Sequence, residues 1–333
     1  MDNYKVDVFT GIRPSGGLTI ANVIGSVHSI VKLQNEDEIG RPLVFVADLH
    51  GLTDKEPKET QNHVLDIVKD YITLGLDIKK NDIFVQSQIT PLIAELNLYL
   101  SRLVSISELL RIPTLKDKMK SGQSETSVNA LLAMYPVMMA SDILIQRAKY
   151  IPVGDDQVAH VEFARMVARK FNKRYTEIFP IPKVLSLGEP LRIISLNGKG
   201  KMSKTEPTGA ILIDDPIEIS LNKIKKAQSA FAGETSDTLD TIVTIGKFVG
   251  NEQEIKQIGE IMERHFKGEN VMGQLKEVVM VGLERYLKDF QSKKAKLTDE
   301  YVLEVIENGK KVALKNATET INDVRKAMSL EYV

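Results

Sequence analysis

The sequence predicts an α/β protein whose doubly wound parallel sheet is followed by an all-helical domain. In the first two-thirds of the chain, short apolar runs alternate with amphipathic segments of helical period. This alternation is typical of parallel strands joined by crossover helices. After residue 207 only the helical periodicity remains. We therefore expect two domains, residues 1–207 and residues 208–333, with the change of character near residues 208–215.

Individual elements follow from the apolar pattern. Strands are expected at residues 6–11, 43–47, 83–85, 150–153 and 192–196. Helices are expected at residues 23–33, 92–103 and 127–146, and a further helix follows residues 154–157 and ends at Phe171. In the second domain, helices are expected at residues 219–231, 255–266, 275–290 and 300–314, with Thr298 as an N-cap. Because ligands of such sheets bind at the carboxyl ends of the strands, Gly11 and His50 should converge there. His50 taken alone fits a purely structural role equally well.

Composition excludes several classes of site. The 333 residues are 43% hydrophobic and 27% charged, as in ordinary soluble globular proteins, and the net charge of -1 gives no general signal for binding polyanions. The chain contains no cysteine, which excludes disulfides, cysteine-based zinc sites and iron–sulfur clusters. Its five histidines lack metal-ligand spacing, so no metal site is predicted. Without a membrane-spanning apolar run or a signal-peptide pattern, we expect a cytoplasmic protein with no membrane association.

Two turns between a strand and a helix have the composition of ligand sites. Residues 13–17 read R-P-S-G-G, and backbone N–H groups with a helix dipole behind them attract phosphate. Their glycines match neither the dinucleotide nor the P-loop pattern, so an ordinary tight turn explains them as well. Residues 154–157 read G-D-D-Q, where helix capping competes with ligand binding as the explanation.

Two further segments carry charge where chemistry could use it. Residues 197–207, N-G-K-G-K-M-S-K-T-E-P, are named here the lysine loop. Lysines on a glycine-rich, mobile loop suit a substrate whose negative charge moves during reaction, although an isolated K-x-x-K would indicate only a basic surface. Asp142 shares an apolar helix face with Tyr135 and Met139. A carboxylate there needs a partner, which is either a neighbouring loop or a ligand.

These motifs together resemble the class I aminoacyl-tRNA synthetases, most closely the tryptophanyl-tRNA synthetase family. P-S-G-x-x-T-I-x-N is present at residues 14–22, and K-M-S-K at residues 201–204. Y-P-x-x-M-A-x-D-I-L is present at residues 135–144, and V-G-x-D-Q at residues 153–157. The motifs occur in the expected order over the first two-thirds of the chain, whereas the last third matches only in helical character and length.

The resemblance implies a Rossmann-like, nucleotide-binding catalytic domain and a helical anticodon-binding domain, usually in a homodimer. It implies that tryptophan and ATP, with Mg²⁺, form tryptophanyl-adenylate, and that tryptophan then moves to tRNA(Trp). The attacking carboxylate is already ionised, so catalysis becomes positioning and stabilisation of charge on the leaving pyrophosphate.

The resemblance also implies roles for individual residues. Catalytic roles fall on Lys201, Lys204, Thr19, Asn22 and Lys118, with Lys116 as a further lysine that could reach the phosphates. ATP binding is implied for Arg13, Pro14, Ser15, Gly16, Thr19, Asn22, Gly154, Asp156, Gln157, Lys201, Met202, Ser203 and Lys204. Tryptophan binding is implied for Phe9, Gly11, His50, Tyr135, Met139, Asp142, Ile143, Val153 and Gln157, with Asp142 accepting the indole N–H and Tyr135 and Gln157 binding the ammonium group.

Three positions depart from the family pattern. Ala21 stands where glycine is common, Thr205 replaces a serine, and Arg13 replaces a frequent glutamine. Arg13 adds a cation beside the phosphates or the carboxylate, and this puts substrate and inhibitor affinity in question rather than the reaction. The alternatives are a tyrosyl-tRNA synthetase, a catalytically silent RNA-binding relative, and another nucleotidyltransferase acting on a small acid. Tryptophan is preferred over tyrosine because of T-x-x-N at residues 19–22 and the segment M-M-A-S-D at residues 138–142.

Overall fold

Five parallel strands form the centre of the first part of the chain. The computed structural model describes residues 6–14, 16–35, 40–53, 55–113, 129–154, 157–185 and 193–332. The strands are β1 (Phe9–Ile12), β2 (Leu43–Val46), β3 (Asp82–Val85), β4 (Tyr150–Pro152) and β5 (Lys183–Leu185). β1, β2 and β3 pair in parallel, as do β4 and β5.

A short connection joins the two sets of strands beside β1. The Tyr150 amide donates to the Asp7 carbonyl at 2.7 Å, and Val8 forms a parallel bridge with Tyr150. The strand order is therefore 3-2-1-4-5, which is the doubly wound order. The predicted fold class is confirmed.

Alternation along β2 separates two hydrophobic cores. Val44 and Val46 belong to the core that includes the helices after β1 and the helical part of the chain, whereas Leu43 and Phe45 belong to the core on the other face. All four side chains are buried, as expected for a central strand covered on both faces.

The helices of the first part are α1 (Ile20–Asn22), α2 (His28–Leu33), α3 (Asp48–Gly51), α4 (Pro57–Asn62), α5 (Val64–Thr73), α6 (Thr90–Ser101), α7 (Ile106–Leu109), α9 (Ala130–Ile145) and α10 (Val158–Arg174), with the 3₁₀ turn η2 (Gln86–Ile89).

The helix expected at residues 23–33 begins earlier than predicted and contains a π-helical turn. α1 runs into η1 (Val23–Val27) and then into α2 without a break. Val23, Ile24 and Val27 are buried, so the π turn keeps its apolar side chains in the core. Single π turns inside α-helices are frequent at functional sites.

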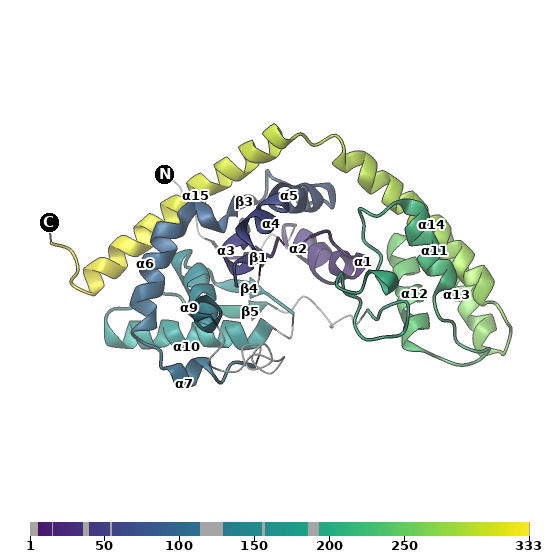
Figure 1. The fold of residues 1–333 in the computed structure, drawn as a ribbon, viewed down its shortest axis with the longest axis horizontal. Helices are drawn as coiled ribbons and strands as arrows, with labels where there is room; N and C mark the ends of the chain where they lie inside the picture. The colour runs from purple at the N-terminus through teal and green to yellow at the C-terminus, as the bar shows by residue number, and fades with distance from the viewer. Residues whose placement is uncertain are drawn as a thin grey trace.

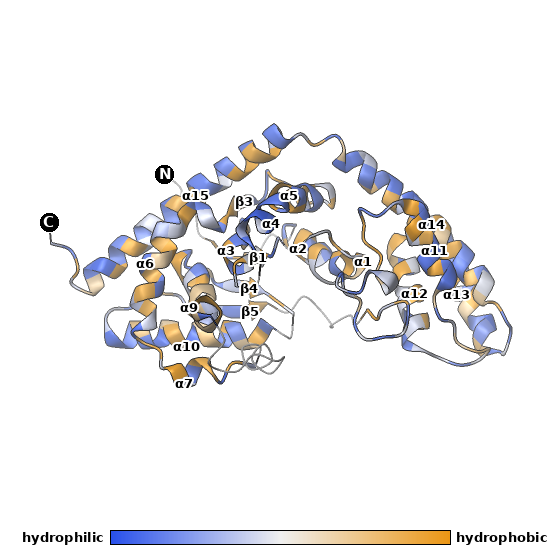
Figure 2. Ribbon diagram, viewed as in Figure 1, coloured by the Kyte–Doolittle hydropathy of each residue, from blue (hydrophilic) through white to orange (hydrophobic). Residues whose placement is uncertain are grey.

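The second part of the chain is built from helices in its described residues, apart from loops and an isolated bridge between Leu212 and Thr19. Its elements are η4 (Pro207–Gly209), α11 (Ile217–Lys226), α12 (Asp237–Val249), α13 (Glu252–Phe266), α14 (Met272–Lys294) and α15 (Asp299–Ala327). α11 to α14 form a lobe on the right of Figure 1, and α15 runs back over the α/β part. The ribbons of α14 and α15 alternate between hydrophilic and hydrophobic residues, as expected for helices with one buried face (Figure 2). None of the helices in the described part of the chain has the length and apolar character needed to span a membrane.

α15 packs directly against the edge strand of the sheet. A Cβ atom added at Gly309 would lie 1.9 Å from the carbonyl oxygen of Ile83, so only glycine permits this approach. Further along, Ala313, Ala317 and Ile321 enter the core that contains Phe45. Covering an edge strand in this way blocks pairing with another chain. The boundary at residue 207 stays a prediction, and both cores contain residues from before and after it.

One expected strand is wrong, and two elements were not predicted. Residues 193–196 are not a strand of the parallel sheet, because Ile194 pairs antiparallel with Lys201 in a local hairpin and its amide donates to Thr241 of α12 at 3.0 Å. Arg192 lies outside the described residues. The strand Lys183–Leu185 and the helix Asp237–Val249 were not predicted. Thr298 does cap α15, since its hydroxyl accepts from the Tyr301 amide at 3.2 Å.

Candidate active site

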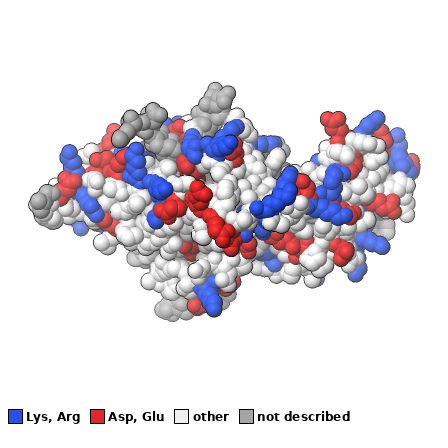
Figure 3. All heavy atoms as spheres, turned by 90° about the horizontal axis from the view of Figure 1, so that it is seen from above, with Lys and Arg blue, Asp and Glu red and all other residues white. Residues whose placement is uncertain are grey.

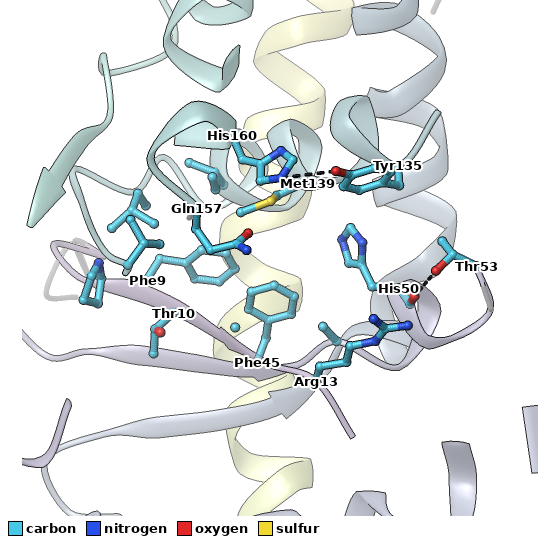
Figure 4. Close-up of a pocket in the computed structure, with 16 residues that line it drawn as sticks. Phe9, Thr10, Arg13, Phe45, His50, Thr53, Tyr135, Met139, Gln157 and His160 are labelled. Carbon is cyan, nitrogen blue, oxygen red and sulfur yellow. Dashed lines mark hydrogen bonds between the residues drawn. The ribbon is translucent and has the colours of Figure 1, made fainter. Parts of the chain in front are cut away.

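A cavity of about 360 Å³ lies at the carboxyl ends of β1 and β4. These strands are the neighbours between which the winding of the sheet reverses, and ligands of doubly wound sheets bind at this point. Figure 4 shows side chains from both parts of the sheet and from the surrounding helices facing the cavity. Its lining residues are Phe9, Thr10, Gly11, Arg13, Phe45, Ala47, His50, Thr53, Tyr135, Met139, Ile143, Ile151, Pro152, Val153, Gln157 and His160.

Two stacked aromatic rings form one wall of the cavity. The Phe9 and Phe45 rings lie 4.7 Å apart with an angle of 3° between their planes. A Cβ atom on Gly11 would lie 2.6 Å from Cε1 of Phe45, so the glycine leaves room for this ring. Phe9 and Gly11 lie two residues apart on β1 and therefore face the same side of the sheet. The resulting wall is flat and apolar.

α9 supplies the opposite side of the cavity. Tyr135, Met139 and Ile143 recur every four residues and all line it. The Tyr135 hydroxyl lies 3.2 Å from Nε2 of His160, which belongs to α10. Asn129 caps the start of α9 by accepting from the Leu132 amide at 2.8 Å. Apolar contact area and a polar edge thus face the cavity from one helix.

Asp142 lies behind His50 and is not among the residues that line the cavity. Its side chain is buried, and Gln86 Nε2 donates to both carboxylate oxygens at 2.8 Å. Nε2 of His50 lies 2.9 Å from one of the same oxygens, within hydrogen-bond distance. Burial raises the pKa of Asp142, while the hydrogen bond from His50 opposes that shift. In this arrangement His50 separates the carboxylate from the cavity.

The turn after β1 leads into a fully capped helix. The Thr19 hydroxyl accepts from the Asn22 amide at 3.2 Å, and the Thr19 amide donates to Asn22 Oδ1 at 3.0 Å. This capping box satisfies two N–H groups at the helix start, and a third, the Ile20 amide, donates to the Ile211 carbonyl at 2.8 Å. Gly16 has a φ of 104°, a conformation that favours glycine.

The lysine loop folds as a tight hairpin on the helical lobe. Met202 is buried in the core that contains α12, and its amide donates to the Ile193 carbonyl at 2.9 Å. Gly198 and Gly200 have φ values of 75° and 70°, which the hairpin requires. Lys199 and Lys201 are exposed. The anchored methionine fixes the loop on one side while its lysines remain at the surface.

Lys204 lies within electrostatic range of two other cations. Its half-buried ammonium group has a lowered pKa because of burial and then because of repulsion from Lys55 and Arg13. Arg13 lines the cavity, and Lys55 forms an ion pair with Glu59 at the start of the next helix. Repulsion among cations favours an anion between them.

The structure gathers most of the predicted tryptophan-binding residues around one cavity. Every residue of that set except Asp142 lines it, and so do Arg13 and Gln157 of the ATP set. Pro14, Gly16, Thr19, Asn22, Gly154 and residues 201–204 lie outside the lining. Ser15, Lys116, Lys118 and Asp156 fall outside the described residues. The roles given to all these residues stay predictions.

Several residues that line the cavity or lie near it were not predicted from the sequence. Phe45 was assigned to a strand, but the face that it presents depends on the register with β1. His160 lies in the first turn of α10, and Gln86 directly follows β3. Only the folded arrangement of these elements brings the two side chains close to the cavity. Lys55 belongs to none of the sequence motifs, so its position near Lys204 was not predicted. No group of three or more histidine, aspartate or glutamate side chains able to hold a metal occurs among the residues that the structure describes.

Comparison with known proteins agrees with this geometry. The family model of class I tRNA synthetases for tryptophan and tyrosine matches residues 1–299. A tryptophan–tRNA ligase of Chlamydia caviae is 32% identical, over 98% of this chain and 97% of its own length. One of Clostridium acetobutylicum is 39% identical over 72% of this chain and 71% of its own length. The crystal structure of the Campylobacter jejuni tryptophanyl-tRNA synthetase with ADP and tryptophan superposes with a TM-score of 0.83 at 28% identity, covering 97% of this chain and 100% of that one.

Proposed function

The chain belongs to the tryptophan–tRNA ligase family of class I tRNA synthetases, and on this premise we propose that it activates tryptophan with ATP and transfers it to tRNA(Trp). In the first step the tryptophan carboxylate attacks the α-phosphorus of ATP, and the bond to pyrophosphate breaks. In the second step a ribose hydroxyl of the tRNA attacks the carbonyl carbon of the adenylate, and AMP leaves. Because the first nucleophile is already ionised, the enzyme has to position the substrates and stabilise charge on the pyrophosphate.

The flat apolar cavity carries this proposal. The Phe9–Phe45 wall and the side chains of Met139 and Ile143 suit a planar aromatic ring. Polar groups lie at its edge, where Tyr135 and Gln157 would meet the amino acid's ammonium group. Asp142 would accept the indole N–H, and this requires His50 to move aside because its ring lies against the carboxylate.

ATP would bind along the turn after β1, with its triphosphate between Arg13 and Lys204. The positive end of the helix dipole at the start of the capped helix favours the negatively charged nucleotide, and the cations offset the charge of the phosphates. Mg²⁺ enters as part of the nucleotide substrate. Lys201 would reach the β- and γ-phosphates when the lysine loop closes.

ATP–pyrophosphate exchange tests the amino acid specificity. Labelled pyrophosphate should enter ATP when tryptophan is present, and no exchange should occur with tyrosine. Sites built around a specific hydrogen-bond donor discriminate by about 10⁴–10⁵. Exchange with tyrosine alone would favour the tyrosyl alternative, and exchange with neither would favour a silent RNA-binding relative. Subsequent charging of tRNA(Trp) separates the enzyme from a nucleotidyltransferase that stops at the adenylate.

Dimerisation and location complete the proposal. Leu98 on α6 and Ile106 on α7 are 70% and 69% exposed and offer apolar area to a second copy. Light scattering should give a dimer for the wild type and a monomer for Leu98→Glu with Ile106→Glu. A dimer that persists in this variant would place the interface elsewhere. Cell fractionation would test the cytoplasmic location.

A further inference from the structure

A second cavity of about 250 Å³ lies on the other side of the turn after β1. Four aspartates and one histidine face it together with the glycines of that turn. Its lining residues are Gly16, Gly17, His63, Asp66, Ile67, Asp70, Leu212, Asp214 and Asp215. None of these side chains belongs to the tryptophan cavity. The turn predicted to bind ATP therefore separates an apolar cavity from an acidic one.

Lys294 binds two of these aspartates at once. Its ammonium nitrogen lies 2.6 Å from Asp70 Oδ1 and 2.9 Å from both carboxylate oxygens of Asp214. The Lys294 side chain is 15% exposed and that of Asp70 is 1% exposed, so this contact is largely shielded from water. Lys294 is the last residue of α14, which runs from the helical lobe to the region of α5 (Figure 1). The ion pairs thus connect α14, α5 and the segment around Asp214.

The segment that carries Asp214 is attached to both halves of the proposed ATP site. The Ile20 amide donates to the Ile211 carbonyl at 2.8 Å, and the Ile213 amide donates to the Leu18 carbonyl at 3.0 Å. These bonds place the segment beside the start of the capped helix. Upstream, the Leu196 amide donates to the Gly209 carbonyl at 2.8 Å and closes the base of the lysine loop. A displacement of Asp214 would therefore move the loop relative to the helix start.

α14 fixes the same segment by a second contact. Gln291, one turn before Lys294, donates from Nε2 to the carbonyls of Ile213 and Asp215, each at 3.0 Å. Lys223 of α11 donates to the Ala210 carbonyl at 2.7 Å and to Asp215 Oδ2 at 2.8 Å. These contacts hold the segment to the helical lobe. Only the Lys294 contact among them also reaches α5, since Asp70 lies on that helix.

The neighbouring lysine provides a natural contrast. Lys293 pairs with Asp289 one turn earlier on the same helix, and both side chains are 60% exposed. Exposed pairs of this kind contribute little to stability because water and salt screen them. Asp70 and Lys294 are shielded from water, so removing one of them deprives the other of a buried polar partner that solvent cannot replace. Figure 3, which shows the molecule from above, has lysines and arginines beside aspartates and glutamates at several places on the exposed surface.

We propose that Lys294, Asp70 and Asp214 form a clamp that positions the turn after β1 and the lysine loop for ATP. The three are positioning residues for adenylate formation, and they act through the ladder between residues 18–20 and 211–213. The proposal rests on the function proposed above. It assigns the acidic cavity to the geometry of the ATP site and not to the recognition of tryptophan.

Steady-state ATP–pyrophosphate exchange on purified full-length variants tests the clamp. The set comprises wild type, Lys293→Met, Lys294→Met, Lys294→Arg and the double variant Asp70→Asn with Lys294→Met. The double variant removes the ion pair without leaving a buried charge, which guards against simple failure to fold. Binding of radiolabelled tryptophan without ATP is measured on the same samples by equilibrium dialysis.

The double variant and Lys294→Met should lose about 10-fold in kcat/KM for ATP, because small displacements of substrate-positioning groups cost this much or more. Their tryptophan affinity should stay within about 2-fold of wild type, since a positioning role at the phosphate side leaves the apolar cavity intact. Lys293→Met should behave as wild type, and Lys294→Arg should recover most of the loss.

Two results would overturn the clamp while leaving the proposed function in place. One is a kcat/KM for ATP in both Lys294→Met variants equal to that of Lys293→Met. The other is a parallel loss of tryptophan affinity, which would mean a general structural role. A wild-type chain without tryptophan-dependent exchange would overturn the proposed function, and the clamp with it.

Discussion

The apolar cavity and the phosphate side of this site are built in different ways. The cavity is lined by strands and helices of one core, with aromatic rings packed in the sheet. The phosphate side combines the turn after β1, the lysine loop and Lys55, and the loop is anchored on the helical lobe through Met202. Rigid, local packing suits recognition of an amino acid. A site assembled from distant segments suits a substrate that changes charge and must be enclosed and released.

The contrast implies that substitutions should separate cleanly into two kinds. Changes around the cavity should alter the KM for tryptophan, and changes on the phosphate side should alter the use of ATP.

The largest effect is expected for Lys204→Ala, which should lower adenylate formation by about 10²–10³-fold, comparable to the loss of one oxyanion donor. Single-turnover formation of the adenylate measures it. Lys199→Ala is the matched control because Lys199 is exposed on the same loop. Full activity of Lys204→Ala would refute the role of Lys204.

Asp142→Asn tests the other side of the comparison. In the asparagine variant one carboxylate oxygen becomes an NH₂ group, which cannot accept the hydrogen bond that Gln86 donates. The variant also lacks the negative charge that would attract the indole N–H of tryptophan. Hydrogen bonds to charged groups are worth about 1.5–3 kcal/mol, so the KM for tryptophan should rise by roughly 10- to 100-fold with the fold retained. The KM for ATP should not change. An unaltered affinity for tryptophan would exclude Asp142 as the specificity residue.

Gly11→Ala should narrow the cavity and act more weakly. The added methyl group would lie 2.6 Å from the Phe45 ring, which cannot turn away freely because it is stacked on Phe9. Overpacking costs about 1–3 kcal/mol of stability, and the ring can avoid it only by moving into the cavity. A rise of up to about 10-fold in the KM for tryptophan is therefore expected, because tryptophan must push the ring back against part of this cost. Gly259→Ala is the control, since a Cβ there meets no atom within 4 Å. Equal KM values for the two variants would show that Phe45 adapts.

The last prediction concerns the acidic cavity and the pH dependence of stability, not activity. Burial, and then the charge of Asp214, raise the pKa of Asp70 to about 7 despite the attraction of Lys294. Asp66 adds repulsion, and His63 and Asp215 line the same cavity. The folded protein therefore holds a proton on Asp70 between about pH 4 and pH 7 that the unfolded chain has released, so this residue's contribution to stability falls as pH rises through that window.

Urea unfolding of wild type and Asp70→Asn at pH 5, 6, 7 and 8 measures this contribution. The wild type should lose stability relative to the variant as pH rises to 7, and the difference should level off above it. Curves that remain parallel across this range would contradict the raised pKa. Lys293→Met again serves as the control, because its exposed ion pair should not alter the pH dependence.

Sequence reasoning predicted the layers of the fold and most of one wall of the cavity. It placed four of the five strands, because buried parallel strands are continuous apolar runs. It failed for Lys183–Leu185, which is a strand of three residues, and for residues 193–196, whose apolar side chains pack on the helical lobe instead of the sheet. An apolar pattern in the sequence predicts that side chains are buried, but it does not show which element of the fold covers them.

Within the site, motif residues were easier to predict than their partners. Phe9, Tyr135 and Met139 line the cavity as expected, because a helix or strand fixes their direction. His50, Gln86 and Asp142 meet only because three separate elements converge, so no local pattern could reveal that His50 covers the carboxylate. The roles of Lys55 and Lys294 could not be predicted for the same reason. Their significance lies in contacts across more than a hundred residues of sequence.

The approach of Gly309 to the backbone of Ile83 has a consequence for how the protein is made. During synthesis β3 emerges more than two hundred residues before the part of α15 that covers it. Until then this edge of the nascent sheet has exposed backbone groups able to pair with another chain. We therefore expect active enzyme to form only after residues 309–324 have been translated and released.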